Sequence, residues 1–333
     1  MTEGRKRAPR NRTLTVNESE REQLLSAIVS PKGCQVDISI VNKVVNDDFK
    51  NVLSLVDDNS ISLLILDPPY NLNKIFNSSR FPKTTIGEYT SYLEGIFDSF
   101  IPKLKPNASV YICGDWYSSI SIYEAATKFF VVRNRITWER EKGRGAKLNW
   151  KNCGEDIWFC TVGKEYTFNA GDVKLRRTVI APYKEDGKPK DWVDSDKGKF
   201  RDTAPSNLMS DITIPFWSMP ENTDHPTQKS EKLIAKLILA SSNEGELVCD
   251  PFLGSGTTAV VSSKLNRKFL AFEREKKYCL WAQKRLMRAQ IDKEVQGFND
   301  GVFWERNSLS LQKKNDKAKD IIKKENKQSL FDI

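Results

Sequence analysis

Short apolar runs with little polar alternation recur along the chain, and helical patterns lie between them. Four runs have this character, at 61–66, 109–113, 247–250 and 268–273. Such runs are typical of strands buried on both faces of a sheet. Apolar side chains at helical spacing predict helices over four segments, 88–104, 230–242, 257–266 and 276–290. The alternation of strands and helices predicts an α/β fold with a mostly parallel sheet covered on both faces.

The remaining segments divide the chain into predicted regions. β-Branched residues predict strands at three more places, 38–46, 131–138 and 156–162. The stretch 171–223 is rich in Lys, Asp, Pro and Gly, which is typical of an insertion of short strands and loops. We therefore expect a main domain in two parts, 21–170 and 224–295, around this insertion. A basic disordered tail at 1–20 would precede it, and a Lys-rich tail at 296–333 would follow it.

Composition narrows the class of protein further. No stretch approaches 18 consecutive apolar residues, and no apolar segment follows the basic first residues, so neither a membrane span nor a secretory signal is expected. The six cysteines form no CxxC pair, which is typical of reduced thiols in a cytoplasmic protein. With His225 as the single histidine and no paired cysteines, a bound metal is not expected.

The net charge of +9 is concentrated at the two ends of the sequence. Residues 1–12 contain five basic residues and one acidic residue, and residues 313–328 contain seven lysines and three acidic residues. Each end therefore contributes a net charge of +4. Basic ends of this kind are often only solvated, and they also bind polyanions such as DNA without sequence preference. Both interpretations stay open at this point.

The first motif with chemical content is Asp67-Pro68-Pro69-Tyr70, directly after the apolar run at 61–66. An exocyclic amine of a base is a poor nucleophile because its lone pair is delocalised into the ring. The Asp67 carboxylate and the Pro68 carbonyl could accept hydrogen bonds from its two N–H groups and so favour a nitrogen with an available lone pair. The prolines make the turn rigid, and Tyr70 offers an aromatic face to an extruded base. An ordinary Pro-Pro turn after a strand would contain the same residues.

The second motif, DPFLGSGTT at 250–258, joins a predicted strand to a predicted helix. Gly254 and Gly256 let backbone N–H groups approach a ligand closely, and the N-terminus of a helix favours a carboxylate. Glu273 lies 19 residues after Gly254, at the end of the next strand, where an acidic side chain can bind ribose hydroxyls. A tight strand–helix turn would use the same glycines. No lysine follows them as in a phosphate-binding loop, so hydrolysis of ATP or GTP is not expected.

The two motifs, in this order, resemble the amino-methyltransferases of bacterial restriction–modification systems. The order is that of the β group, in which the catalytic motif precedes the cofactor motif. A third element, HPTQK at 225–229, matches the family's HPTQKP, with Ser230 in place of the last proline. The resemblance covers about residues 38–290. It implies a Rossmann-like, S-adenosylmethionine-dependent methyltransferase fold with a mostly parallel seven-stranded sheet and a small target-recognition insertion.

The resemblance also implies roles for individual residues. The target base would be held by the tetrapeptide Asp67, Pro68, Pro69 and Tyr70. The cofactor S-adenosylmethionine would meet Asp48 near its adenine, Glu273 at its ribose and Lys229 near its methionine carboxylate. The second motif would supply further cofactor contacts from Asp250, Phe252, Leu253, Gly254, Ser255, Gly256 and Thr257. A solvated turn is the alternative for Asp48, and a purely structural role is the alternative for His225.

Two basic segments are candidates for contact with DNA, the expected macromolecular partner. Segment 133–151 contains seven basic and two acidic residues, with Trp138 and Trp150 among them. Its glycines predict a loop that could order over DNA, and a solvated surface loop is the alternative. The insertion 171–223 is the candidate for reading base edges, through Arg176, Arg177, Lys184, Lys188, Lys190 and Arg201. A cognate restriction endonuclease is an expected functional partner, and formation of a homodimer stays open.

These expectations converge on site-specific transfer of a methyl group from S-adenosylmethionine to N6 of adenine in DNA. Methylation of cytosine at N4 is the first alternative, although Asp67 favours adenine where a serine would favour cytosine. An RNA methyltransferase is a second alternative, disfavoured by the HPTQK element and by Asp67 in place of asparagine. A non-catalytic DNA-binding subunit is a third, disfavoured by the intact tetrapeptide and glycine motifs.

Overall fold

The computed structural model describes residues 8–31, 39–76, 79–140, 148–180, 183–195 and 198–308. The chain forms two compact units. The first consists of the chain up to Asn169 together with Ser206–Lys293, and the second consists of Ala170–Pro205 together with the chain from Glu294 onward. The inserted unit thus ends at Pro205, earlier than the predicted residue 223. Residues 296–308, predicted as part of a tail, belong to this inserted unit, as do residues 294 and 295, predicted as the end of the main domain.

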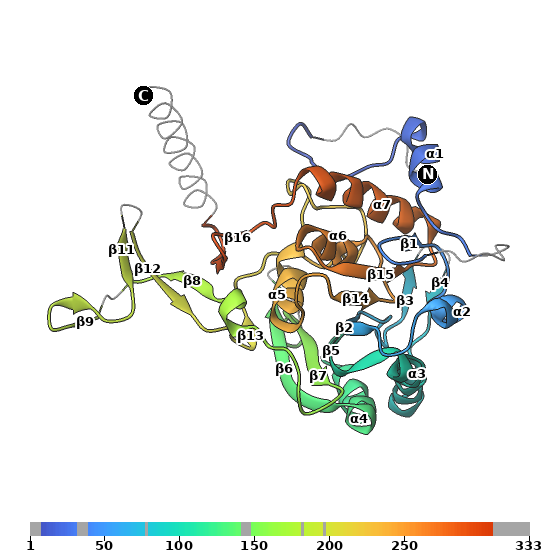
Figure 1. The fold of residues 1–333 in the computed structure, drawn as a ribbon, viewed down its shortest axis with the longest axis horizontal. Coiled ribbons are helices and arrows are strands. Elements are labelled where there is room, and N and C mark those ends of the chain that lie inside the picture. The colour runs from blue at the N-terminus through green and yellow to red at the C-terminus, as the bar shows by residue number, and fades with distance from the viewer. Residues whose placement is uncertain are drawn as a thin grey trace. The chain divides into compact units, whose positions relative to one another are not determined.

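An eight-stranded sheet organises the first unit (Figure 1). In spatial order its strands are β1 (Val44–Val45), β15 (Lys268–Phe272), β14 (Leu247–Asp250), β2 (Ile61–Leu66), β5 (Leu104–Gly114), β7 (Gly154–Thr161), β6 (Val131–Glu139) and β13 (Leu208–Met209). Strand β7 runs antiparallel to β5 and β6, and every other neighbouring pair is parallel. The predicted α/β fold with a mostly parallel sheet is therefore confirmed. The sheet has one strand more than expected because even the two-residue strands β1 and β13 pair at its edges.

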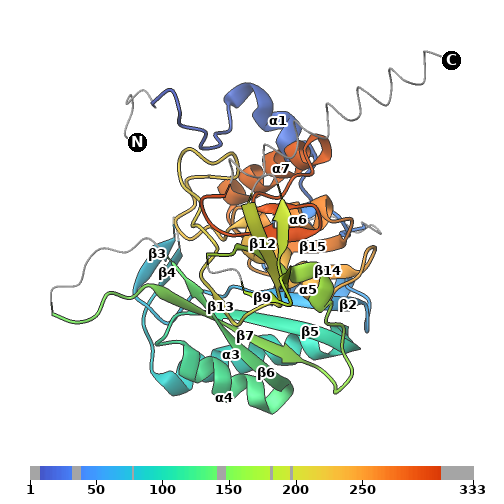
Figure 2. The same cartoon turned by 90° about the vertical axis from the view of Figure 1, so that its left-hand side faces the viewer.

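Helices cover both faces of this sheet. Helices α3 (Ile86–Phe100) and α4 (Ser119–Phe129) lie on one face, whereas α5 (Glu231–Ser241), α6 (Thr257–Lys264) and α7 (Lys276–Ile291) lie on the other (Figure 2). Helix α3 begins at a capping box formed by Thr85 and Glu88. Its buried apolar stripe packs with residues of β2 and β5 in the largest core cluster, which includes Leu93, Phe97, Phe100, Leu64 and Val110. Helix α4 was not predicted.

The predicted strand 38–46 is shortened to Val44–Val45. A turn closes just before it, in which the Lys43 amide donates to the Ile40 carbonyl and Asn42 takes the left-handed conformation with φ 61°. The short helix α2 (Phe49–Val52) follows the strand, and Asp48 is its N-cap. The hairpin of β3 (Lys74–Phe76) and β4 (Ser79–Phe81) follows the tetrapeptide. In the described segments, 3-10 helices lie at Leu53–Leu55, Ile101–Lys103 and Ala170–Val173.

The prediction of a disordered N-terminal tail is wrong for residues 8–20. The Arg12 and Leu14 amides donate to the carbonyl groups of Trp217 and Asn222, and helix α1 (Glu18–Ser26) follows. Leu14 is 1% exposed because it packs with Tyr278 and Trp281 of α7. A single well-buried leucine therefore anchors a segment that is otherwise polar. Residues 1–7 of the predicted tail lie outside the described residues.

The second unit contains a five-stranded sheet and a separate hairpin. In spatial order the sheet consists of β11 (Val193–Ser195), β12 (Gly198–Thr203), β8 (Leu175–Thr178), β17 (Val302–Trp304) and β16 (Phe298–Asn299). The hairpin pairs β9 (Lys184–Glu185) with β10 (Lys188–Pro189). The side chains of Phe200, Val302 and Trp304 form the core of the sheet. The short strands predicted for this stretch are present, whereas the lysines of the predicted C-terminal tail lie beyond residue 308 and outside the described part of the chain.

None of the helices in the described ranges is long and apolar enough to cross a membrane.

Candidate active site

The predicted functional residues meet at one edge of the central sheet. Strands β1, β15, β14 and β2 are parallel neighbours, so their carboxyl ends lie at the same edge. Asp67 follows β2, Asp250 ends β14, Glu273 follows β15 and Asp48 lies three residues after β1. A single open cavity at this edge is lined by residues of every predicted motif, among them Asp48, Asp67, Tyr70, Lys229, Gly254 and Glu273. Residues of both predicted motifs therefore line one cavity, and their roles in binding base and cofactor stay predictions.

Asp67 belongs to a tight cluster of charged and phenolic groups. The Lys229 ammonium contacts both Asp67 oxygens, with Nζ at 2.9 Å from Oδ1 and 2.8 Å from Oδ2. The same Nζ lies 2.7 Å from Oε1 of Glu155 and 3.1 Å from the Tyr70 hydroxyl. The Tyr70 hydroxyl lies 2.6 Å from Glu155 Oε1 and 2.9 Å from Asp67 Oδ1. Arg140 closes the cluster from the end of β6, with Nη1 at 3.0 Å from Glu155 Oε2.

Burial and ion pairing act against one another in this cluster. Burial alone would lower the pKa of Lys229, but the carboxylates of Asp67 and Glu155 raise it well above its ordinary value. Burial would likewise raise the pKa of Glu155, but Lys229 and Arg140 hold it below its ordinary value. Burial and the two carboxylates together raise the pKa of Tyr70. Glu155 is therefore ionised at neutral pH, Lys229 is a cation and Tyr70 is a neutral phenol.

The Lys229 ammonium has partners that the sequence did not predict. Its ammonium has three protons, and Asp67, Glu155 and Tyr70 all lie within hydrogen-bond distance of it. Contact with a methionine carboxylate stays a prediction, and in this structure the side chain is directed to the tetrapeptide. Glu155 and Arg140 were not predicted as site residues. The available signal for Glu155 was an acidic side chain within a strand whose neighbours are buried, where a charge requires a partner.

The two glycines of the second motif are required for different reasons. Gly254 has φ 56°, and a Cβ there would lie 3.1 Å from Nε2 of His225, at the cavity. Gly256 has φ 91°, and a Cβ there would lie 2.6 Å from the Cβ of Ala282 on α7. Gly254 therefore lets the backbone border the cavity, whereas Gly256 allows α7 to pack closely on the turn. The predicted role of Gly256 in binding the cofactor stays a prediction, and its packing role was not foreseen.

Asp250, Ser255 and Thr257 brace the glycine turn from inside. Oδ1 of Asp250 accepts a hydrogen bond from the Phe252 amide at 2.9 Å, and burial raises the pKa of Asp250 to about 7. Arg285 of α7 donates from Nη1 to the Ser255 carbonyl and to the Thr257 hydroxyl, both at 3.0 Å. Asp250, Ser255 and Thr257 therefore shape the turn, which lines the cavity with Pro251, Phe252 and Gly254. A smaller cavity beside Asp67 and Lys229 is lined by Asp250, Leu253, Ser255 and Thr257.

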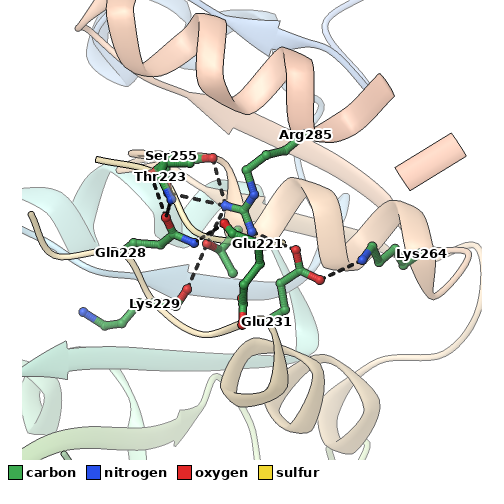
Figure 3. A network of polar contacts seen from close by, with 9 residues as sticks. Glu221, Thr223, Gln228, Lys229, Glu231, Ser255, Lys264 and Arg285 are labelled. Carbon is green, nitrogen blue, oxygen red and sulfur yellow. Dashed lines mark hydrogen bonds and ion pairs between the residues drawn. The ribbon is translucent and has the colours of Figure 1, made fainter. Parts of the chain in front are cut away.

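The HPTQK element lies beside this turn (Figure 3), and its Lys229 also contacts Asp67. The Gln228 amide accepts from the Thr223 amide and hydroxyl at 2.9 and 2.6 Å and donates to the Glu221 carbonyl at 2.7 Å. These bonds fix the backbone immediately before Lys229. The Lys229 carbonyl accepts from the Thr257 hydroxyl at 3.1 Å, while its side chain points away from this network toward Asp67. Lys229 thus joins the glycine turn, through its backbone, to the tetrapeptide, through its side chain.

The remaining predicted cofactor residues lie on the other side of the cavity. Glu273 accepts from the amides of Gly254 and Glu275, each at 2.8 Å, and burial raises its pKa to about 7. Asp48 caps α2 by accepting from the Lys50 amide at 3.1 Å. The rings of Phe49 and Phe252 pack edge to face near them, with centroids 5.7 Å apart. This side of the cavity therefore combines an aromatic wall with acidic hydrogen-bond acceptors.

Comparisons with known proteins agree with this geometry. Residues 61–284 match the family model described as DNA methylase, for N6 and N4 methyltransferases. The chain is 30% identical over 253 residues to the Type II methyltransferase M.BglII of Bacillus subtilis, covering 72% of this chain and 67% of that protein. It is 30% identical over 260 residues to the DNA adenine methyltransferase YhdJ of Escherichia coli strain K12, covering 73% and 82%.

A solved structure with a similar fold is the cytosine-N4-specific PvuII DNA methyltransferase. The TM-score is 0.56 at 18% sequence identity, and the similarity covers 75% of this chain and 88% of that one. At this level of identity the likeness concerns the fold alone.

Proposed function

Because the chain belongs to the DNA methylase family of N6 and N4 methyltransferases, with S-adenosylmethionine as methyl donor, we propose that it methylates N6 of adenine at specific sites in DNA. The observation that carries the proposal is the position of the Asp67 carboxylate, held by Lys229 at the cavity that Glu273 and Gly254 also line. The identity to a DNA adenine methyltransferase supports adenine as the target base. The identity to Type II methyltransferases supports a role in a restriction–modification system.

The tetrapeptide end of the cavity would hold the base. The Asp67 side chain is 23% exposed, so it remains accessible from the cavity while Lys229 fixes its orientation. We assign one N–H group of the target amine to Asp67 and the other to the Pro68 carbonyl. The hydroxyl of Tyr89 donates to the Pro69 carbonyl at 2.9 Å and stiffens the turn. Asp67 is the nearest acceptor for the proton that leaves the nitrogen after methylation.

The opposite end of the cavity fits S-adenosylmethionine. That cofactor supplies an electrophilic methyl group on a sulfonium. Glu273 presents carboxylate oxygens suited to ribose hydroxyls, and Phe49 and Phe252 offer apolar rings suited to an adenine. The backbone at Gly254 borders the cavity where a side chain would contact His225. Asp48 lines the same end, so its proposed position near the adenine is consistent with the cavity.

In this proposal the enzyme acts on DNA. The proposed location of the enzyme is the cytoplasm. Arg140 lies at the base end of the cavity and is the last described residue before segment 141–147. Its side chain is 35% exposed. An arginine in that position is suited to a phosphate of the bound strand. The predicted loop that follows it lies outside the described residues. A cognate restriction endonuclease that cuts the same unmodified sites completes the proposed system.

The direct test is incubation of the protein and labelled S-adenosylmethionine with DNA and, in a parallel reaction, with RNA, followed by digestion to nucleosides and chromatography. We expect label in N6-methyldeoxyadenosine. Label in N4-methyldeoxycytidine would replace adenine by cytosine in the proposal. Label in RNA, with none in DNA, would overturn DNA as the substrate.

A further inference from the structure

Glu155 is a second carboxylate at the base end of the cavity. It lies near the start of β7, and its side chain is only 4% exposed. Three groups surround it: the Lys229 ammonium at 2.7 Å, the Tyr70 hydroxyl at 2.6 Å and the Arg140 guanidinium at 3.0 Å. Two of these, Lys229 and Tyr70, also contact Asp67. Glu155 and Asp67 therefore compete for the same donors.

The charges of the cluster balance, two cations against two carboxylates. Lys229 lies between Asp67 and Glu155, and Arg140 adds a second positive charge on the far side of Glu155. Without Glu155, the whole ammonium charge of Lys229 would be directed at Asp67. A carboxylate that already accepts strong hydrogen bonds from an ammonium has less capacity to accept one from a weakly polar amine. The ability of Asp67 to hold a base thus depends on how its neighbour shares Lys229.

We propose that Glu155 is a positioning residue for methyl transfer: it shares the Lys229 ammonium with Asp67 and so keeps Asp67 able to accept a hydrogen bond from the target amine. This inference rests on the proposed function in requiring an exocyclic amine as the acceptor of the methyl group. It holds for adenine and for cytosine alike. The Glu155 side chain is 4% exposed and contacts Lys229, Tyr70 and Arg140, so we assign its effect to these contacts and not to contact with the base.

The neighbouring residue on the same strand offers a matched control. Asp156 is also buried and ion-paired, but its oxygens contact Ser119, Thr137 and Arg135, outside the cavity. The substitutions Glu155→Gln and Asp156→Asn each remove one buried negative charge while keeping the shape of the side chain. A general effect of losing a buried carboxylate would appear in both variants.

The first measurement is the split between turnover and cofactor binding. We expect Glu155→Gln to lower kcat at least tenfold while the Kd for S-adenosylmethionine stays within about twofold of the wild type. Asp156→Asn should keep kcat within about threefold. Wild-type turnover in Glu155→Gln would overturn the inference, and so would an equal loss of kcat in the two variants.

The second measurement tests whether Glu155 acts through Lys229. In the Lys229→Met background the further change Glu155→Gln should have little effect on kcat, because the ammonium that Glu155 shares is gone. Independent, multiplicative losses in the double variant would overturn the inference. The double variant removes one positive and one negative charge together, so it should fold even if Lys229→Met folds poorly. In that case its kcat is compared with that of Glu155→Gln.

A third measurement needs no methyl transfer. The Lys229 ammonium lies 2.7 Å from Glu155, so at neutral pH the ¹⁵Nζ resonance of Lys229 should shift in Glu155→Gln and keep its wild-type position in Asp156→Asn. An unchanged resonance in Glu155→Gln would overturn the inference even if the enzyme methylates adenine as proposed. Conversely, a wild-type protein that methylates no DNA would refute the proposed function and leave this spectrum as a separate result.

Discussion

Acidic side chains at the two ends of the cavity have different kinds of partner. At the base end, Asp67 and Glu155 are matched by the cations of Lys229 and Arg140. At the cofactor end, the partners of Glu273 are the backbone amides of Gly254 and Glu275. The pKa values respond accordingly: Glu155 is held below its ordinary pKa, whereas burial raises that of Glu273 to about 7.

This difference indicates a division of labour. In the proposed reaction, fixed ion pairs preorganise the base end, so that charge need not be rearranged when the amine reacts. A carboxylate held by amides alone has remaining lone pairs for the hydroxyl groups of a ligand and gains from a nearby positive charge. The cofactor end is therefore suited to a cationic nucleoside, and the base end to the chemical step. Substitutions at the two ends should separate turnover from cofactor affinity.

The largest effect is expected for Asp67→Ala, which removes the acceptor at the base end. Loss of one preorganised hydrogen-bond partner costs about 2.7–4 kcal/mol of barrier, or roughly 10²–10³ in kcat. Single-turnover kinetics with labelled S-adenosylmethionine would measure it. Turnover close to that of the wild type would mean that Asp67 has no part in the chemistry.

A second prediction concerns Gly254→Val at the cofactor end. Its φ of 56° is strained for a β-branched residue, and the new side chain would contact His225 at the cavity. We expect affinity for S-adenosylmethionine to fall more than tenfold. Gly245→Val is the control, because Gly245 also has a positive φ, 78°, but an added Cβ there has no atom within 4 Å. Both variants should lose stability, and equal loss of affinity in both would remove the glycine turn from the binding site.

The sequence predicted those parts of the site that depend on strand order. Asp67, Gly254 and Glu273 follow parallel strands, so recognising the strands placed all three at one edge. The resemblance to the amino-methyltransferase family is confirmed by the family match and by the relatives. The role of Glu155 could not be predicted from the order of the parallel strands. Glu155 lies on the antiparallel strand β7, 85 residues from Tyr70 along the chain. A local sequence pattern does not indicate a contact between residues so far apart in the sequence.

Two further features of the structure were missed because they also depend on contacts between residues far apart in the sequence. The tail predicted for residues 8–20 is held by Leu14, whose partners on α7 lie more than 260 residues away in the sequence. The cofactor role of Gly256 stays a prediction, and its close packing against Ala282, which an added Cβ would meet, was not foreseen. In both cases the deciding contact is a tertiary one between an unremarkable residue and a distant helix.

A third prediction uses the raised pKa of Glu273. Its folded-state pKa of about 7 means that the side chain is largely protonated below pH 7 and ionised above it. The ionised form is the stronger acceptor for ribose hydroxyls and the better partner for a sulfonium, so affinity for S-adenosylmethionine should rise about three- to tenfold between pH 6 and pH 8. Calorimetry at several pH values would measure this rise, and Glu273→Gln should flatten it. An equal rise in the variant would assign the titration to another group.

The smallest effect is expected outside the cavity. Trimming the chain to residues 8–308 removes ten basic and five acidic residues, a net charge of +5, and keeps the segment that Leu14 anchors. If the ends contact phosphates, the salt dependence of DNA affinity should become shallower, with the methylated atom unchanged. Binding titrations of both proteins at several salt concentrations would measure the slope. Identical slopes would show that the ends are only solvated.

The division of labour is tested most directly by titrating S-adenosylmethionine into Asp67→Ala and Glu273→Ala by calorimetry under identical conditions. We predict that Asp67→Ala binds the cofactor within about threefold of the wild type, whereas Glu273→Ala binds it at least tenfold more weakly. A loss of affinity in Asp67→Ala as large as that in Glu273→Ala would contradict the separation of the cavity into a base end and a cofactor end.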